Sequence, residues 1–128
     1  MLPLRLGRFW AAVGWAGVLA GLVLSLWPGG VPLPVQVWDK IQHATGYFLL
    51  TSWFTGFYPR RRYLLIGTAC VLLGVCIEGL QALTPTRTAE LGDACANAVG
   101  VALALVLAYA GLGGWAARVE RLLGLAPR

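Results

Sequence analysis

Four long apolar runs alternate with short polar or proline-containing segments along the chain. The run over residues 9–27 has no charged side chain and is about as long as the roughly 20 residues that cross a bilayer as a helix. The runs over residues 63–83 and 88–112 are of similar length. This pattern predicts three membrane-spanning helices.

A weaker run lies over residues 39–58, where histidine, glutamine, serine and threonine side chains interrupt the apolar residues. Such polarity predicts a fourth span that faces other helices. Asp39, His43 and Tyr47 follow one another at a spacing of four residues, so they share one side of this helix. We expect that side to point into a helix bundle.

Small and charged residues predict further packing features. Gly14, Gly17 and Gly21 give the first span a face suited to close helix packing, and Gly100 and Ala104 offer the same kind of contact in the last span. Beyond residue 112, apolar residues fall on one side of a helix and charged residues, Glu120 among them, on the other. This tail is predicted to form an amphipathic surface helix.

The composition agrees with a membrane location, because 59% of the residues are hydrophobic and 12% are charged. The formal net charge of +5 does not indicate nucleic-acid binding, since the basic residues lie between apolar runs and not among aromatic residues on a polar face. A chain of 128 residues has room for one domain. We therefore predict a single all-α membrane domain over residues 1–128, with four transmembrane helices in a compact bundle and a short C-terminal amphipathic helix.

The arginines predict how this bundle is oriented. Four spans place the N-terminus, the connection near residue 60 and the C-terminus on one side, which carries eight arginines against one acid, Glu120. By the positive-inside rule, this side is cytoplasmic. The arginines are Arg5, Arg8, Arg60, Arg61, Arg62, Arg118, Arg121 and Arg128. The sequence thus predicts a multi-pass protein of the cell membrane with both termini in the cytoplasm.

The remaining charged residues, together with His43, fall in the outer half of the predicted bundle. With a rise of about 1.5 Å per residue, His43, Glu78 and Asp93 lie roughly 6 to 8 Å below the outer surface, although they come from three different helices. An ionisable group inside a membrane-spanning helix indicates a functional site by default. We expect these groups to meet in one polar cluster.

The same residues, read in order, form the pattern D-K-x-x-H-x-x-x-Y, E-x-x-Q, P-x-R and G-D-x-x-x-N-x-x-G. This pattern resembles the VanZ-like family of small bacterial membrane proteins, which is named for an accessory protein of teicoplanin resistance. The resemblance covers residues 39–100 and implies an envelope protein and, for some members, glycopeptide resistance. The matching positions are Asp39, Lys40, His43, Tyr47, Glu78, Gln81, Arg87, Asp93, Asn97 and Gly100.

Two hypotheses for the cluster require no reaction. In the first, the polar groups pair only with one another and fix the helices in register. In the second, an outward-facing pocket binds the polar or anionic head group of an envelope lipid, a cell-wall precursor or an amphiphilic drug, with Lys40 and Arg87 on anionic oxygens. The expected ligand-binding residues are Lys40, His43, Tyr47, Glu78, Gln81, Arg87, Asp93 and Asn97.

Catalysis is a third hypothesis, in which His43, oriented by Asp39, acts as a general acid or base with Glu78 or Asp93 as its partner. No known hydrolase or kinase motif supports it. The same four side chains are candidate ligands for a divalent metal, but the basic residues nearby would repel the cation, so we expect neither a metal nor a cofactor. A subunit or chaperone role beside a larger envelope enzyme is a fourth hypothesis. We favour binding over catalysis.

Overall fold

The computed structural model describes residues 1–26, 36–83 and 90–125. Within these ranges every regular element is helical, which confirms the predicted all-α class for the described part of the chain. In chain order the elements are α1 (Gly7–Leu26), α2 (Gln36–Phe57), the 3-10 turn η1 (Arg60–Arg62), α3 (Tyr63–Gln81), α4 (Leu91–Leu107), the π-helical turn η2 (Ala108–Leu112) and α5 (Trp115–Leu122).

Three helical stretches are long and apolar enough to cross a membrane: Gly7–Leu26, Arg60–Gln81 and Leu91–Leu112. They correspond to the predicted spans at 9–27, 63–83 and 88–112, although the first two positions of the last range lie outside the described residues. The weaker run also forms a long helix, α2, which begins at Gln36, three residues before the predicted start at Asp39.

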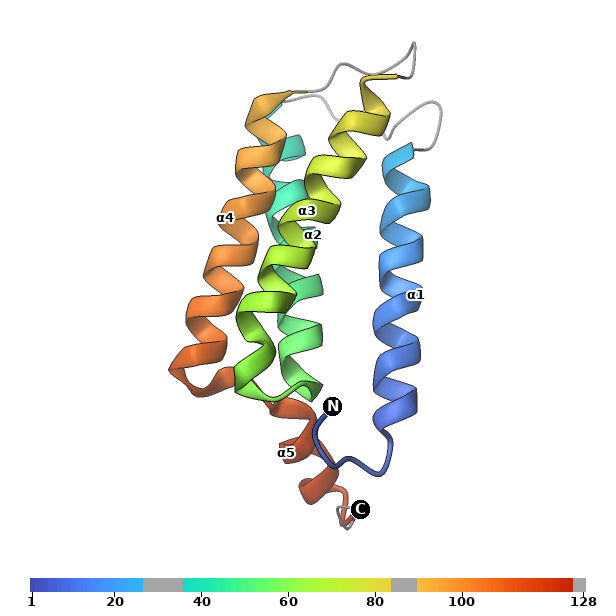
Figure 1. Cartoon of the computed structure of the whole chain (residues 1–128), viewed down its shortest axis with the longest axis vertical. Helices are drawn as coiled ribbons and strands as arrows, with labels where there is room; N and C mark the ends of the chain where they lie inside the picture. Colours follow the sequence, from blue (N-terminus) through green and yellow to red (C-terminus); the bar gives the residue numbers. More distant parts are fainter. Residues whose placement is uncertain (27–35, 84–89, 126–128) are drawn as a thin grey trace.

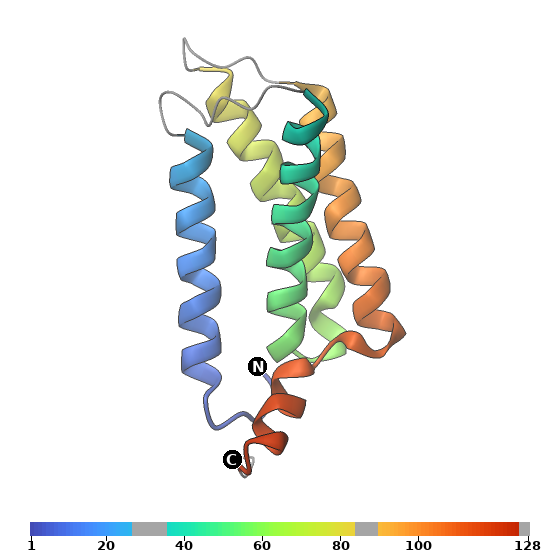
Figure 2. The same cartoon turned by 180° about the vertical axis from the view of Figure 1, so that it is seen from behind.

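Helix α2 is the central helix of the described structure. It lies against α1, α3 and α4, whereas α1 stands apart from α4 on the other side of the molecule (Figures 1 and 2). Thr51 and Thr55 of α2 are therefore buried among other helices and His43 is partly buried, whereas Gln42 and Thr45 are exposed. This arrangement explains why its sequence is less apolar than that of the other long helices.

The close approach of α2 and α4 depends on Gly100. A Cβ atom at this position would overlap the backbone carbonyl of Ala44 and the backbone amide of Phe48 on α2. One turn later, Ala104 is buried in the same interface. The predicted small-residue contact at Gly100 and Ala104 is confirmed, and its effect is to hold α2 and α4 at backbone distance.

A group of tryptophans fills the end of the bundle where α1 begins and α2 ends. The ring centroids of Trp10, Trp53 and Trp115 lie 5.1 to 5.8 Å from one another. Each indole N–H also donates a hydrogen bond: Trp10 to Glu120, Trp53 to the carbonyl of Trp10, and Trp115 to the carbonyl of Ser52. At this end the three rings therefore pack against one another, and each indole N–H has a hydrogen-bond acceptor.

The C-terminal helix α5 is turned back onto this end by a break in the chain after α4. Gly111 has a φ of 113° and Gly114 a φ of 68°, values that favour glycine. The guanidinium of Arg118 donates hydrogen bonds to the carbonyls of Gly111, Leu112 and Gly113, which neutralises the last turn of η2. Helix α5 is thereby aimed at the start of α1.

The expected surface position of Glu120 is wrong. This side chain is only 2% exposed, and its carboxylate accepts hydrogen bonds from the amides of Arg5 (2.7 Å) and Leu6 (2.9 Å) and from Trp10 Nε1 (2.9 Å). The amides of Arg5 and Leu6 lie just ahead of α1, where no helical carbonyl precedes them to accept a hydrogen bond, so the carboxylate supplies the acceptor. Burial raises the pKa of Glu120, but these hydrogen bonds outweigh it and lower the pKa below the ordinary value of 4.5.

Candidate functional site at the polar end

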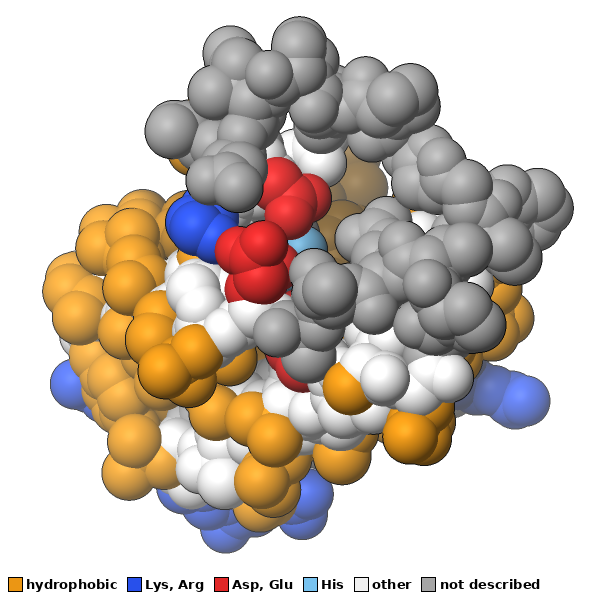
Figure 3. Space-filling model, turned by 90° about the horizontal axis from the view of Figure 1, so that it is seen from above, with side chains coloured by type: hydrophobic (Ala, Val, Ile, Leu, Met, Phe, Trp, Pro, Cys, Tyr) orange, Lys and Arg blue, Asp and Glu red, His pale blue; other side chains and the backbone are white. Residues whose placement is uncertain are grey.

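The opposite end of the bundle collects polar side chains from three helices. We call it the polar end and define it by Asp39, Lys40 and His43 of α2, Glu78 and Gln81 of α3, and Glu90, Asp93 and Asn97 at the start of α4. Figure 3 looks onto this end and shows acidic side chains gathered beside a lysine and the histidine, with hydrophobic side chains around them.

Lys40 joins α2 to the start of α4. Its Nζ atom lies 3.0 Å from Glu90 Oε2 and 3.0 Å from Asp93 Oδ1. Gly92 leaves the space for this contact, because a Cβ atom there would lie 2.8 Å from the ammonium group. The lysine predicted to contact anionic oxygens of a ligand is thus already paired with two carboxylates of the chain.

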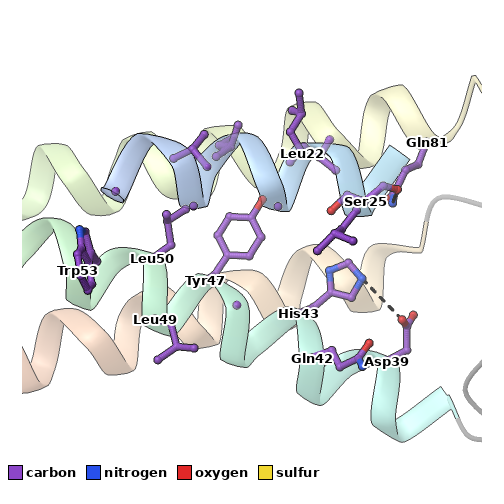
Figure 4. Close-up of a pocket in the computed structure, with 18 of the residues that line it drawn as sticks. Leu22, Ser25, Asp39, Gln42, His43, Tyr47, Leu49, Leu50, Trp53 and Gln81 are labelled. Atoms are coloured by element: carbon purple, nitrogen blue, oxygen red, sulfur yellow. Dashed lines mark hydrogen bonds and ion pairs between the residues drawn. The ribbon is translucent and has the colours of Figure 1, made fainter. Parts of the chain in front are cut away.

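His43 lies between the carboxylates of two helices. Asn97 Oδ1 is 3.2 Å from His43 Nδ1; because this oxygen can only accept, the neutral imidazole carries its proton on Nδ1 and leaves Nε2 as an acceptor. Nε2 lies 3.9 Å from Asp39 Oδ1 and 4.0 Å from Asp93 Oδ2, beyond hydrogen-bond distance (Figure 4). This nitrogen is therefore placed to take up a proton next to two anions.

Three side chains of this group are arranged so that a metal ion would be geometrically feasible. One ligand atom from each of Asp39, His43 and Asp93 lies within 4.8 Å of the other two. Lys40, however, already occupies Oδ1 of Asp93. Glu78, the fourth predicted ligand, does not belong to this group. The expectation that the cluster binds no metal stays a prediction.

Glu78 is the buried carboxylate of α3. It is 7% exposed, and neither of its oxygens completes a hydrogen bond within the described residues, although the backbone of Glu90 approaches it. Asp93 and His43 are close enough to interact with it electrostatically. The structure therefore brings Glu78 to the same level as the groups of α2 and α4 but leaves its carboxylate without the donors that burial normally requires.

The remaining predicted residues have different positions. Gln81 Nε2 donates a 2.7 Å hydrogen bond to the carbonyl of Ser25, so this residue links α3 to α1 at the polar end. Tyr47 lies further down α2 with its ring against Gly74 of α3. Arg87 lies outside the described residues.

Glu90 is a part of the cluster that the analysis of the sequence did not include among the ligand-binding residues. It caps α4, and its side chain lies on Lys40. The available signal was its position three residues before Asp93, which places both carboxylates on one side of the helix start. The contact between Gln81 and Ser25 had no such signal, because a backbone carbonyl can belong to any residue.

A groove of about 590 Å³ leads away from the polar end between α1, α2 and α3. Asp39, Gln42 and His43 lie at its mouth, Tyr47 lies along its wall, and Trp53 lies at its floor (Figure 4). Most of the surface between these residues is aliphatic or glycine. The site thus combines a charged mouth with an apolar interior.

The glycine face of α1 lines this groove. Close packing is confirmed at Gly14, where a Cβ atom would lie 2.9 Å from the ring of Trp53. The expectation of close packing within the chain is wrong at Gly17 and Gly21, where a Cβ atom would meet nothing within 4 Å among the described residues. Helix α1 contacts α2 at the tryptophan end and diverges from it towards the polar end, which opens the groove.

Comparison with known proteins adds little to this geometry. No family model matches the chain. Over 91 residues, 67% of this chain, it is 37% identical to an uncharacterized protein of Schizosaccharomyces pombe, and the match spans 56% of that protein's length. No solved structure matches the chain.

Proposed function

We propose that this protein is a multi-pass membrane protein of the VanZ-like kind, with four spans and both termini in the cytoplasm. Helix α2 would be a span in addition to the three apolar stretches, which brings the number to four. Its 22 residues give a length of about 33 Å, enough for a hydrocarbon core of about 30 Å. Its contacts with three other helices support this, since they bury Thr51 and Thr55 and partly bury His43. The arginines of η1 and α5 share the end at which both termini lie (Figure 1).

The orientation can be tested with reporters fused to the full chain. A reporter that is active only in the cytoplasm should be active when it follows residue 128 and inactive when it is inserted into the segment at 84–89. Activity at both positions would contradict the proposed arrangement.

We further propose that the polar end faces the outside and binds the polar head group of an envelope component, a lipid or a peptidoglycan precursor. One observation carries this proposal: among carboxylates that three helices bring together, the buried Glu78 completes no hydrogen bond within the described residues, although the backbone of Glu90 approaches it. A network that served only to hold helices together would satisfy its buried members, because an unpaired buried carboxylate is costly. A link to teicoplanin resistance follows from the VanZ-like resemblance and is part of the proposal.

Abundance and phenotype must be measured together. We expect His43→Gln, Asp93→Asn and Arg87→Ala to leave the amount of protein in the membrane unchanged and to abolish any protection that the wild type gives against teicoplanin or cell-wall stress. Gly79→Ala is the control, since it changes an exposed position of α3 with open space around it. Loss of abundance in all three variants would instead assign the cluster to folding.

Catalysis is the second candidate function. The geometry of His43 favours acid–base chemistry over other reactions at this site. The contact with Asn97 leaves Nε2 free to act as a general base, and the flanking carboxylates of Asp39 and Asp93 would stabilise the imidazolium that forms. His43→Gln would abolish such an activity. If His43→Gln kept the full phenotype while Asp93→Asn and Arg87→Ala lost it, catalysis by His43 would be excluded and the head group would be bound without this side chain.

A further inference from the structure

The groove below the polar end has features that the proposed head-group site does not explain. Its mouth is the polar end itself, and its interior continues along α1 and α2 as far as Trp53. A ligand with only a polar head would leave this interior unused. The shape calls for a ligand with both a head and a chain.

The length of the groove matches a lipid chain. Along α2, its lining runs from Asp39 to Trp53, which is about 21 Å at a rise of about 1.5 Å per residue. Half of a hydrocarbon core of about 30 Å is about 15 Å, the depth that one leaflet's acyl chain occupies. One extended alkyl chain therefore fits between mouth and floor.

The groove excludes a partner helix. It is bridged near its mouth by the hydrogen bond from Gln81 to Ser25 and closed at its floor by the contact of Gly14 with Trp53. A helix is about 10 to 12 Å across with its side chains, so it could enter between α1 and α3 only by breaking both connections. A flexible alkyl chain does not require this.

The charge of the mouth selects the head group. Among the described residues that line the groove, Asp39 is an acid, His43 is a neutral or positive base, and neither lysine nor arginine is present. By sequence alone, the stretches 39–43 and 78–93 hold four acids, Asp39, Glu78, Glu90 and Asp93, and two cations, Lys40 and Arg87. Lys40 is already paired with Glu90 and Asp93. The excess of carboxylates is complementary to a positively charged head.

We propose that the groove binds a single-chain amphiphile, or one chain of a lipid, whose head group carries an amine. The ammonium group lies at the mouth beside Asp39, and the chain lies along Gly17 and Gly21 towards Trp53. This inference rests on the proposed head-group function of the polar end and names its ligand class. It names a cationic head group in place of the polar or anionic head group expected from the sequence.

The experiment uses the full-length protein purified in a neutral maltoside detergent. The probes are three 16-carbon chains that carry the same nitroxide at the far end and an amine, a hydroxyl or a carboxylate as the head. Binding is followed by quenching of tryptophan fluorescence, because Trp53 lies at the floor of the groove. We expect the amine to bind at least ten-fold more tightly than the carboxylate, and Asp39→Asn to remove most of that preference.

Glycine variants test the position of the chain. Gly17→Leu places a side chain in open space inside the groove and should weaken binding of all three probes at least ten-fold. Gly79→Leu is the matched control, because its surroundings are equally open but it does not line the groove. Gly21→Leu is a second variant of the same kind, to be used if Gly17→Leu unfolds the protein. Thermal unfolding and gel filtration check that each variant is folded.

The outcomes separate the two proposals. If both groove variants bind like the wild type while Asp39→Asn still alters head-group preference, the chain position is wrong and the head-group function stands. If the carboxylate binds more tightly than the amine, the cationic class is wrong. If the probes bind equally and no variant at the polar end or in the groove changes binding, both proposals fail.

Discussion

Two buried glutamates at opposite ends of the molecule have opposite surroundings. Glu120 is 2% exposed and accepts hydrogen bonds from two backbone amides and an indole. Glu78 is 7% exposed and completes none within the described residues. A buried carboxylate with three donors holds helices together, whereas one without donors weakens the fold. The comparison indicates that the end near the termini stabilises the fold, and it agrees with the ligand site that we propose at the polar end.

The difference extends to the neighbours of the two residues. Around Glu120, three tryptophans pack edge to face or tilted and use every indole N–H. Glu78 instead interacts electrostatically with Asp93, His43 and Asp39, and the nearby groove contains open space beside Gly17 and Gly21. The four predictions below test this contrast.

The largest effect is expected at Glu120. Glu120→Ala would leave two backbone amides and the Trp10 indole without an acceptor and lower the free energy of unfolding by roughly 3 kcal/mol or more. Glu120→Gln keeps one acceptor oxygen and should cost about 1 kcal/mol. Denaturant unfolding in detergent, followed by tryptophan fluorescence, measures both. Equal stability of Glu120→Ala and the wild type would remove the structural role of this carboxylate.

The next effect concerns the crossing that supports the polar end. Gly100→Ala would push α4 away from the backbone of Ala44 and Phe48 and lower the free energy of unfolding by roughly 2 kcal/mol. Lys40 would then lie further from Asp93, so the ion pair that joins α2 to the start of α4 should also weaken. Gly79→Ala, which meets open space, should change neither property. A neutral Gly100→Ala would show that the helices are not in backbone contact.

A smaller change of the opposite sign is expected at Glu78. Glu78→Met replaces a buried carboxylate that lacks donors by an apolar side chain of similar length, and should raise the free energy of unfolding by about 1 kcal/mol. The same variant should bind the amine probe less well, because it removes a carboxylate that interacts electrostatically with Asp39 and His43 at the mouth, although Glu78 does not itself line the groove. A loss of stability similar to that of Glu120→Ala would make the two ends alike and end the comparison.

The smallest effect is a dependence of stability on pH. Because the folded pKa of Glu120 lies below 4.5, its ionised form stabilises the fold above that value, and this contribution is lost as pH falls through the folded pKa. Protonation leaves one oxygen as an acceptor, so the loss is smaller than that in Glu120→Ala. Below pH 4.5, the unfolding temperature of the wild type should fall more steeply than that of Glu120→Gln. Parallel curves would assign the acid sensitivity to other carboxylates.

The sequence predicted the features of the fold that depend on local pattern. Apolar runs of membrane-spanning length predicted the long helices, and a four-residue spacing predicted the shared side of Asp39, His43 and Tyr47. The contact of His43 with the start of α4 followed from depth alone, because the rise per residue is nearly constant. Local regularities of this kind are readable without knowledge of the neighbouring helices.

The features that the sequence did not predict depend on angles between helices. Glu120 has the spacing of a surface residue, and its burial results from the turn after η2 that directs α5 to α1. Gly14 and Gly17 belong to the same glycine pattern, yet one packs against Trp53 and the other faces open space. The divergence of α1 from α2 decides between these outcomes, and no local pattern encodes it.

The bond between Glu120 and the start of α1 also has a consequence for the order in which the protein is completed during synthesis. The amides of Arg5 and Leu6 are synthesised early, whereas the carboxylate that accepts their hydrogen bonds is synthesised more than 110 residues later. These two amides, which lie just ahead of α1, therefore lack this acceptor until α5 has been synthesised. A chain that stops before residue 120 lacks this contact altogether.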